Sequence, residues 1–165
     1  MHGFDPGLWH EYFLATAGAG AALAGLVFVA FSINLKAILA MPGVTGRGAE
    51  ALVLLLSPTF VAIVGLWPAD TVSRIGIAIA VVGFVLWLVV TGIEIVSLRT
   101  PSTTNAFQRL FRIVLAQLGT IPTIVAGASL AMGVGLGLDY LVISAIFALA
   151  AGLIGAWVLL VEILR

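Results

Sequence analysis

The sequence predicts an all-α fold, a transmembrane helical bundle with five spans. The composition is 62% hydrophobic and 8% charged, whereas soluble domains carry roughly 25% charged residues. Five apolar stretches also approach or exceed the roughly 20 residues that a helix needs to cross a bilayer, and segments rich in turn formers separate them. At 165 residues, we expect a single integral membrane domain, 1–165. The predicted spans are 12–35, 49–67, 74–98, 110–131 and 140–164.

The first span, 12–35, is unusually rich in glycine and alanine and has no charge between Glu11 and Lys36. Its small residues recur at steps of three and four, so they share one helix face. In lipid, small residues let helix backbones approach closely. We therefore expect this face to pack against helices of this chain or of its copies, or to line a pore. The face comprises Ala15, Gly18, Ala22, Gly25, Val29 and Ser32.

The second span, 49–67, contains a proline, Pro58, between two hydroxyl residues. Proline removes one backbone hydrogen bond, so a bend is expected there. A neighbouring hydroxyl can satisfy the freed carbonyl. Glu50 is expected in the first turn, where an acid suits the helix dipole.

The remaining spans are bounded by prolines, glycines and polar residues. The span 74–98 ends before Pro101, because the residue before a proline resists helix. The span 110–131 contains Gln117 and an expected bend at Pro122, and Asp139 precedes the last span. Small-residue faces recur on the last two spans: Gly119, Thr123, Gly127 and Ala131, then Ala148, Gly152 and Ala156.

The basic residues predict the orientation, since loops rich in Lys and Arg stay in the cytoplasm. With five spans, all but Arg74 fall on one side of the membrane. This places the N-terminus outside and the C-terminus in the cytoplasm. The bias towards Arg, Ala and Gly is typical of a bacterial genome rich in GC, so we expect the bacterial inner (cytoplasmic) membrane. The residues on the cytoplasmic side are Lys36, Arg47, Arg99, Arg109, Arg112 and Arg165.

Four of the polar residues inside the predicted spans are candidate site residues, and all four lie in the cytoplasmic half: Asn34, Glu94, Gln117 and Glu162. Ionisable groups in a bilayer are costly and by default suggest function. Glu94 is either a boundary acid paired with an arginine and reaching towards water, or a cation or proton site. Asn34 and Gln117 either line a polar vestibule or form hydrogen bonds between helices.

The residue types exclude several classes of site. The chain has no cysteine and a formal net charge of zero, which excludes thiolate chemistry and a basic footprint for nucleic acid. No nucleophile–base pair or phosphate-binding loop is present, so we expect neither an enzyme nor a cofactor. The acids and histidines of the N-terminal tail match no metal-ligand spacing. They are His2, Asp5, His10 and Glu11.

The first third of the chain resembles a family of small integral membrane proteins common in actinobacteria. The residues that carry the resemblance are Trp9 to Phe13, Gly18 to Gly25 and Leu26 to Leu35, with Pro42, Gly46-Arg47 and Glu50-Ala51-Leu52 after them. The family is largely uncharacterised, and some members are labelled modulators of the FtsH membrane protease. The resemblance implies no catalytic residues.

Two functions remain open from the sequence. Three spans carry small-residue faces, so we expect the protein to associate with itself as a homo-oligomer in the lipid bilayer. One hypothesis is a channel or pore for ions or small solutes, with the first span at its axis. The alternative is a non-enzymatic interaction or regulatory subunit, whose partner is a membrane protease or another membrane complex.

Overall fold

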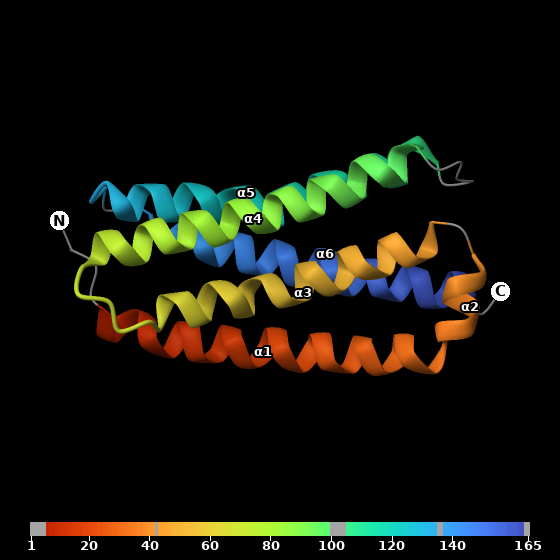
Figure 1. The fold of residues 1–165 in the computed structure, drawn as a ribbon, viewed down its shortest axis with the longest axis horizontal. Helices are drawn as coiled ribbons and strands as arrows, with labels where there is room; N and C mark the ends of the chain where they lie inside the picture. Colours follow the sequence, from red (N-terminus) through yellow and green to blue (C-terminus); the bar gives the residue numbers. More distant parts are fainter. Residues whose placement is uncertain (1–5, 42, 100–104, 135–136, 164–165) are drawn as a thin grey trace.

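The computed structural model describes residues 6–41, 43–99, 105–134 and 137–163. Within these ranges, five helices are long and apolar enough to cross a membrane, which confirms the predicted helical spans. Figure 1 shows them running side by side along the length of the molecule. The helices are α1 Pro6–Ile33, α2 Leu35–Ala40, α3 Val44–Gly65, α4 Val72–Arg99, α5 Ala106–Ala131 and α6 Asp139–Ile163.

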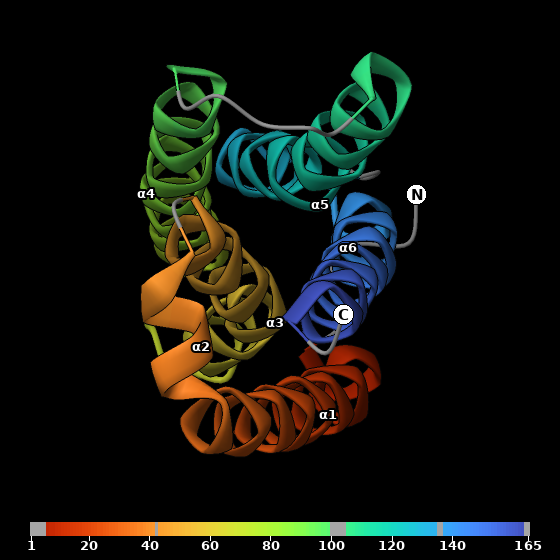
Figure 2. The same cartoon turned by 90° about the vertical axis from the view of Figure 1, so that its right-hand side faces the viewer.

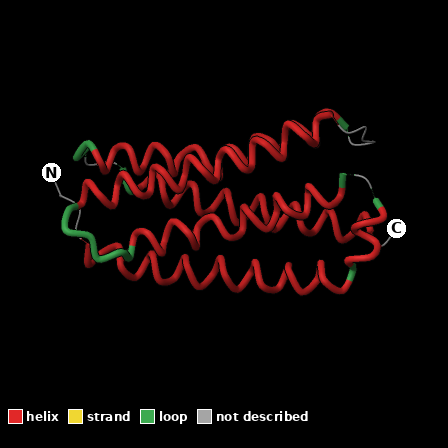
Figure 3. Tube along the Cα trace, viewed as in Figure 1, coloured by secondary structure: helices red, strands yellow, loops and turns green. Residues whose placement is uncertain are grey.

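The connection between the first two long helices differs from the prediction. It contains the short helix α2, which the sequence analysis did not anticipate (Figure 3). The turn that follows includes Gly43 at φ 82°, a left-handed conformation that a side chain would strain. Helix α3 then begins at Val44 rather than near residue 49.

Helices α3, α4, α5 and α6 form a four-helix ring, and α1 packs outside it against α3 (Figure 2). Within the ring, each helix contacts its two neighbours, with the most extensive interface between α4 and α5. In the apolar 18-residue stretch of each helix, 50% of α3 is buried, whereas 22% of α1 is buried. The helix that we expected at a pore axis is thus the peripheral helix of the bundle.

The α4–α5 interface depends on glycine at two facing positions. A Cβ atom placed on Gly127 would lie 2.7 Å from the Cα of Ala80 and 2.7 Å from the carbonyl oxygen of Gly76. A Cβ placed on Gly76 would lie 2.9 Å from the Cα of Ala131. The atoms met are all backbone, so the two helices are in direct backbone contact here, as small residues allow in lipid.

The backbone hydrogen bond that Pro58 removes from α3 is replaced by a side-chain hydrogen bond, as the sequence suggests. Residue 58 has no N–H to donate to the carbonyl of Leu54, and the Ser57 hydroxyl donates to that carbonyl instead, at 2.8 Å. Thr59 Oγ1, on the next residue, donates to the Ala17 carbonyl of α1 at 3.2 Å. The Ser-Pro-Thr segment therefore both satisfies its own helix and attaches α1 to the ring.

Candidate functional site: a polar cavity at one end of the ring

All the described basic residues except Arg74 lie at one end of the bundle. The helices alternate in direction, so the end of α1, the start of α3, the end of α4 and the start of α5 all meet there (Figure 2). Arg74, near the start of α4, lies at the opposite end. Arg165 lies outside the described residues. The basic residues at the shared end are Lys36, Arg47, Arg99, Arg109 and Arg112.

A cavity of about 540 Å³ opens at this arginine-rich end, enclosed by residues of α3, α5 and α6 with Ser97 of α4. Its volume lies within the roughly 300–1,000 Å³ of ordinary ligand sites. Its apolar lining includes Leu54, Leu115, Ala151, Ile154 and Val158. Its charged and polar lining includes Arg47, Glu50, Ser97, Arg112 and Glu162.

Glu50 is the unusual group in this cavity. It lines the cavity, yet it is only 2% exposed, and neither of its carboxylate oxygens accepts a hydrogen bond. The closest ion pair is loose, with Arg112 Nε 3.7 Å from Glu50 Oε1. Arg112 instead donates from its Nη2 to Ser97 Oγ at 3.0 Å. A buried carboxylate without hydrogen-bond donors is costly, so a partner that supplies donors would stabilise this group.

A second buried acid, Glu94, lies behind the cavity in a hydrogen-bond chain. Gln117 Nε2 donates to Glu94 Oε2 at 2.7 Å, and Trp87 Nε1 donates to Gln117 Oε1 at 2.8 Å. Glu94 is 4% exposed, and its Oε1 has no hydrogen-bond partner. Its charge repels that of Glu50, and Arg112 attracts both. Glu50, Glu94 and Arg112 therefore form one electrostatic unit, here called the buried triad.

Glu162 has a different environment at the mouth of the cavity. It forms an ion pair with Arg47 across the gap between α6 and α3. Its side chain is 44% exposed, whereas that of Glu50 is 3% exposed. Glu162 is thus a partnered, hydrated acid, and Glu50 is a buried acid whose oxygens lack donors.

The four polar residues expected inside the spans have different environments in the structure. Glu94 and Gln117 are hydrogen bonded to each other, and Glu94 is buried rather than reaching water. Glu162 pairs with Arg47. Asn34 acts locally, since its Nδ2 donates to the Ala30 carbonyl at the end of α1. Of the four, Glu162 lines the cavity, whereas Glu94 and Gln117 form a hydrogen bond between α4 and α5.

The predicted placement of Glu50 in the first turn of its span is wrong. Helix α3 starts at Val44, so Glu50 lies in the second turn and is buried. The signal that identifies it is the spacing of Glu50, Leu54, Ser57 and Val61, which puts all four on one buried face. In a span that starts near residue 49, Glu50 would lie at the edge of the membrane, where this spacing does not indicate a buried position.

The small-residue face of α1 points away from its own chain. All six of its residues are exposed, and a Cβ on Gly18 or Gly25 would have nothing within 4 Å. The opposite face of α1 makes the contacts within the chain, with Phe13, Ala24, Val27 and Phe31 buried. The face could therefore line a pore only between copies of the chain. Its exposed residues are Ala15, Gly18, Ala22, Gly25, Val29 and Ser32.

The cavity ends at a tightly packed level of the ring. Leu54, Val90, Ala116 and Ala151, one from each helix of the ring, pack together and are at most 8% exposed. They are here called the closed layer. About one turn beyond this layer α5 and α6 come very close, since a Cβ on Gly119 would lie 2.9 Å from the Cα of Ala148. At a rise of about 1.5 Å per residue, the stretch of α5 from Leu115 to Thr123 that crosses this level is about 12 Å long.

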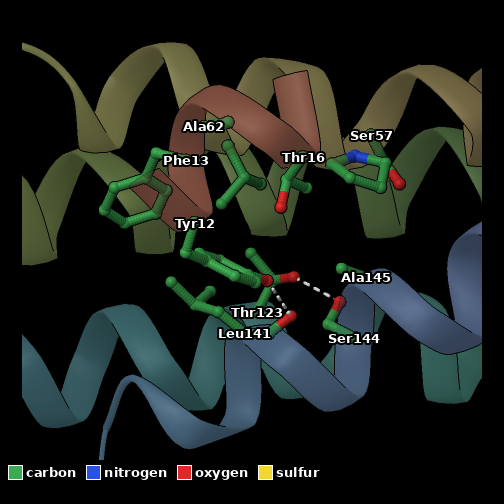
Figure 4. A pocket seen from close by; sticks show the side chains of 11 residues that line it. Tyr12, Phe13, Thr16, Ser57, Ala62, Thr123, Leu141, Ser144 and Ala145 are labelled. Carbon is green, nitrogen blue, oxygen red and sulfur yellow. Dashed lines mark hydrogen bonds between the residues drawn. The ribbon is translucent and has the colours of Figure 1, made fainter. Parts of the chain in front are cut away.

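Beyond the closed layer lies a small cavity of about 10 Å³, lined by hydroxyl groups of α1, α3, α5 and α6 (Figure 4). Ser144 Oγ donates to the Gly119 carbonyl at 2.6 Å, so Thr123 Oγ1 is the donor in the 2.6 Å contact between the two hydroxyls. Tyr12 donates to the Leu141 carbonyl at 3.0 Å. The volume is just enough for about one water molecule.

The geometry defines the class of protein. Five apolar, membrane-length helices around a partly polar interior make this chain a multi-pass helical membrane protein. No family model matches the chain, and comparison with curated proteins and with solved structures likewise gives no match. The resemblance to small actinobacterial membrane proteins therefore stays an expectation. In the described part of the chain, no three His, Cys, Asp or Glu side chains gather as a metal site; His2 and Asp5 lie outside it.

Proposed function

We propose that this membrane protein is a passage for a small polar or charged solute, and that the pathway runs inside the four-helix ring of each subunit. The observation that carries the proposal is the cavity of about 540 Å³ with the unpartnered carboxylate of Glu50 in its wall. Ionisable groups at membrane depth mark solute and ion pathways. The structure then represents a state closed at the layer of Leu54, Val90, Ala116 and Ala151.

The order of the lining residues along each helix supports a single route. On α3 the cavity is lined down to Leu54 and the small cavity begins at Ser57. On α6 the cavity ends at Ala151 and the small cavity begins at Ala145. Helices α3, α5 and α6 line both cavities, and on each of these helices the closed layer lies between the two. Opening the layer would therefore join the two cavities. If Lys- and Arg-rich loops stay in the cytoplasm, the large cavity opens to the cytoplasm.

The test is to widen the closed layer by shortening one side chain. Leu54→Ala removes the largest side chain of the layer, so we expect a faster flux through purified protein in liposomes than for the wild type. Leu153→Ala, on the outward face of α6 (49% exposed), is the matched control and should leave the flux unchanged. Equal fluxes for all three proteins, across a set of ions and small neutral solutes, would remove the pathway.

Self-association is the second part of the proposal. The exposed face of α1 offers a close-packing surface to a copy of the chain or to another membrane protein, which keeps the regulatory-subunit alternative open. Gly25→Leu should lower the apparent particle mass in mild detergent, because a bulky residue prevents backbone contact. Gly92→Leu, at an exposed glycine of α4 with nothing within 4 Å, is the control. A wild-type particle that runs as one chain contradicts self-association.

A further inference from the structure

The cavity wall combines one unsatisfied carboxylate with a mostly apolar surface. We infer that it binds a small organic cation, an amine whose ammonium group lies on Glu50 and whose apolar body fills the cavity. The inference deepens the proposed function and rests on it, since that amine would be the solute. It is supported by the buried triad, by the volume and lining of the cavity, and by the pairing of the other charges.

The charge of the buried triad favours a cation. Two carboxylates, Glu50 and Glu94, face one guanidinium, Arg112, so the ionised triad carries a net charge of −1. Glu50 and Glu94 are only 2% and 4% exposed, so water screens this charge poorly. One ammonium group brings the total to zero. It also supplies hydrogen-bond donors to the two Glu50 oxygens, neither of which has one.

The size and lining of the cavity favour an organic ligand. A volume of about 540 Å³ is far more than a bare metal ion occupies, and lies in the range of sites that hold small organic molecules. Leu54, Leu115, Ile154 and Val158 provide an apolar wall beside Glu50. An amine with a short apolar body satisfies both the carboxylate and the wall.

The surrounding charges argue against an anion. Arg47 is already paired with Glu162, and Arg112 donates to Ser97 while it attracts Glu50 and Glu94. A bound anion could accept a hydrogen bond from Arg112 Nε, which has no partner, but it would lie beside the buried carboxylate of Glu50 and would leave the Glu50 oxygens without donors. A divalent metal is also disfavoured, because a third acidic or histidine ligand is missing from the described neighbourhood of the triad.

The wild-type protein tests the ligand class directly. Benzylammonium, benzyl alcohol and benzoate share one shape and differ in charge, and their binding to the protein in lipid nanodiscs can be measured by ligand-detected NMR against empty nanodiscs. We expect benzylammonium to bind at least about tenfold more tightly than the other two. Stronger binding of benzoate, or no preference for the cation, overturns the inference. Displacement by equimolar sodium also overturns it, because it indicates an inorganic-cation site.

Two matched variants locate the site. Glu50→Gln should weaken benzylammonium binding at least about tenfold, because the amide removes the charge and half of the acceptors. Asp70→Asn changes a partnered acid at the opposite end of the bundle, where Asp70 pairs with Arg74, and should leave affinity within about twofold. Unchanged binding in a folded Glu50→Gln protein overturns the inference; if that variant does not fold, the wild-type charge series still decides it.

Binding and flux separate the two proposals. Amine binding without flux in liposomes supports the site and removes the passage. Flux that shows no preference for the amine, together with equal binding of the three probes, supports the passage and removes the amine site.

Discussion

Adding a single methyl group at the α4–α5 crossing is expected to destabilise the protein strongly. In Gly127→Ala, the new Cβ would lie 2.7 Å from the Cα of Ala80 and 2.7 Å from the Gly76 carbonyl oxygen. Neither atom can rotate away, because both belong to the backbone of α4. The helices must separate over their largest interface, and we expect a loss of about 3 kcal/mol in the free energy of unfolding. Reversible denaturation in mixed micelles measures it.

The control for this prediction is the same substitution where space is free. Gly92, on the outward face of α4, would have nothing within 4 Å of an added Cβ. Alanine has the higher helix propensity, so Gly92→Ala should raise stability by about 0.5–1 kcal/mol. The two glycine-to-alanine changes therefore have opposite signs. A Gly127→Ala protein as stable as Gly92→Ala would mean that α4 and α5 do not touch as described.

The helices themselves could be predicted from the sequence, since the signal is the length and apolar character of each segment. That signal is local and does not depend on how the helices are arranged. The five segments accordingly appear as five long helices in the described ranges. The helix starts were harder to predict, because several residues before 49 in α3 are polar or small and lack the apolar character of a span, although they continue the helix to Val44.

The arrangement of the helices could not be predicted in the same way. Two opposite faces of α1 carry small residues, and periodicity alone does not say which one meets the chain. The structure uses the face with Gly20, where a Cβ would lie 2.9 Å from the Leu55 carbonyl oxygen, and leaves Gly18 and Gly25 outside. The pairing of Glu50 with Glu94 and Arg112 likewise depends on three different helices. Such a cluster exists only once the helices are packed.

The largest effect in the candidate site is expected from Arg112→Gln. The substitution leaves Glu50 and Glu94 buried without the guanidinium that attracts both. Removing one partner of a buried ion pair typically costs about 3–5 kcal/mol. The Arg112 side chain is 25% exposed and its contact with Glu50 is loose, at 3.7 Å, so we expect about 3 kcal/mol, at the lower end of that range. Denaturation at neutral pH measures the loss.

A double variant tests whether charge causes this loss. Glu50→Gln combined with Arg112→Gln removes the uncompensated carboxylate, so it should recover much of the stability that Arg112→Gln loses; such coupling is expected between contacting residues. Arg74→Gln is the surface control. Arg74 pairs with Asp70 at the opposite end, with side chains 56% and 83% exposed, and exposed pairs contribute at most about 1 kcal/mol. If the double variant is no more stable than Arg112→Gln, the loss comes from packing of the long arginine side chain, and the buried triad is not an electrostatic unit.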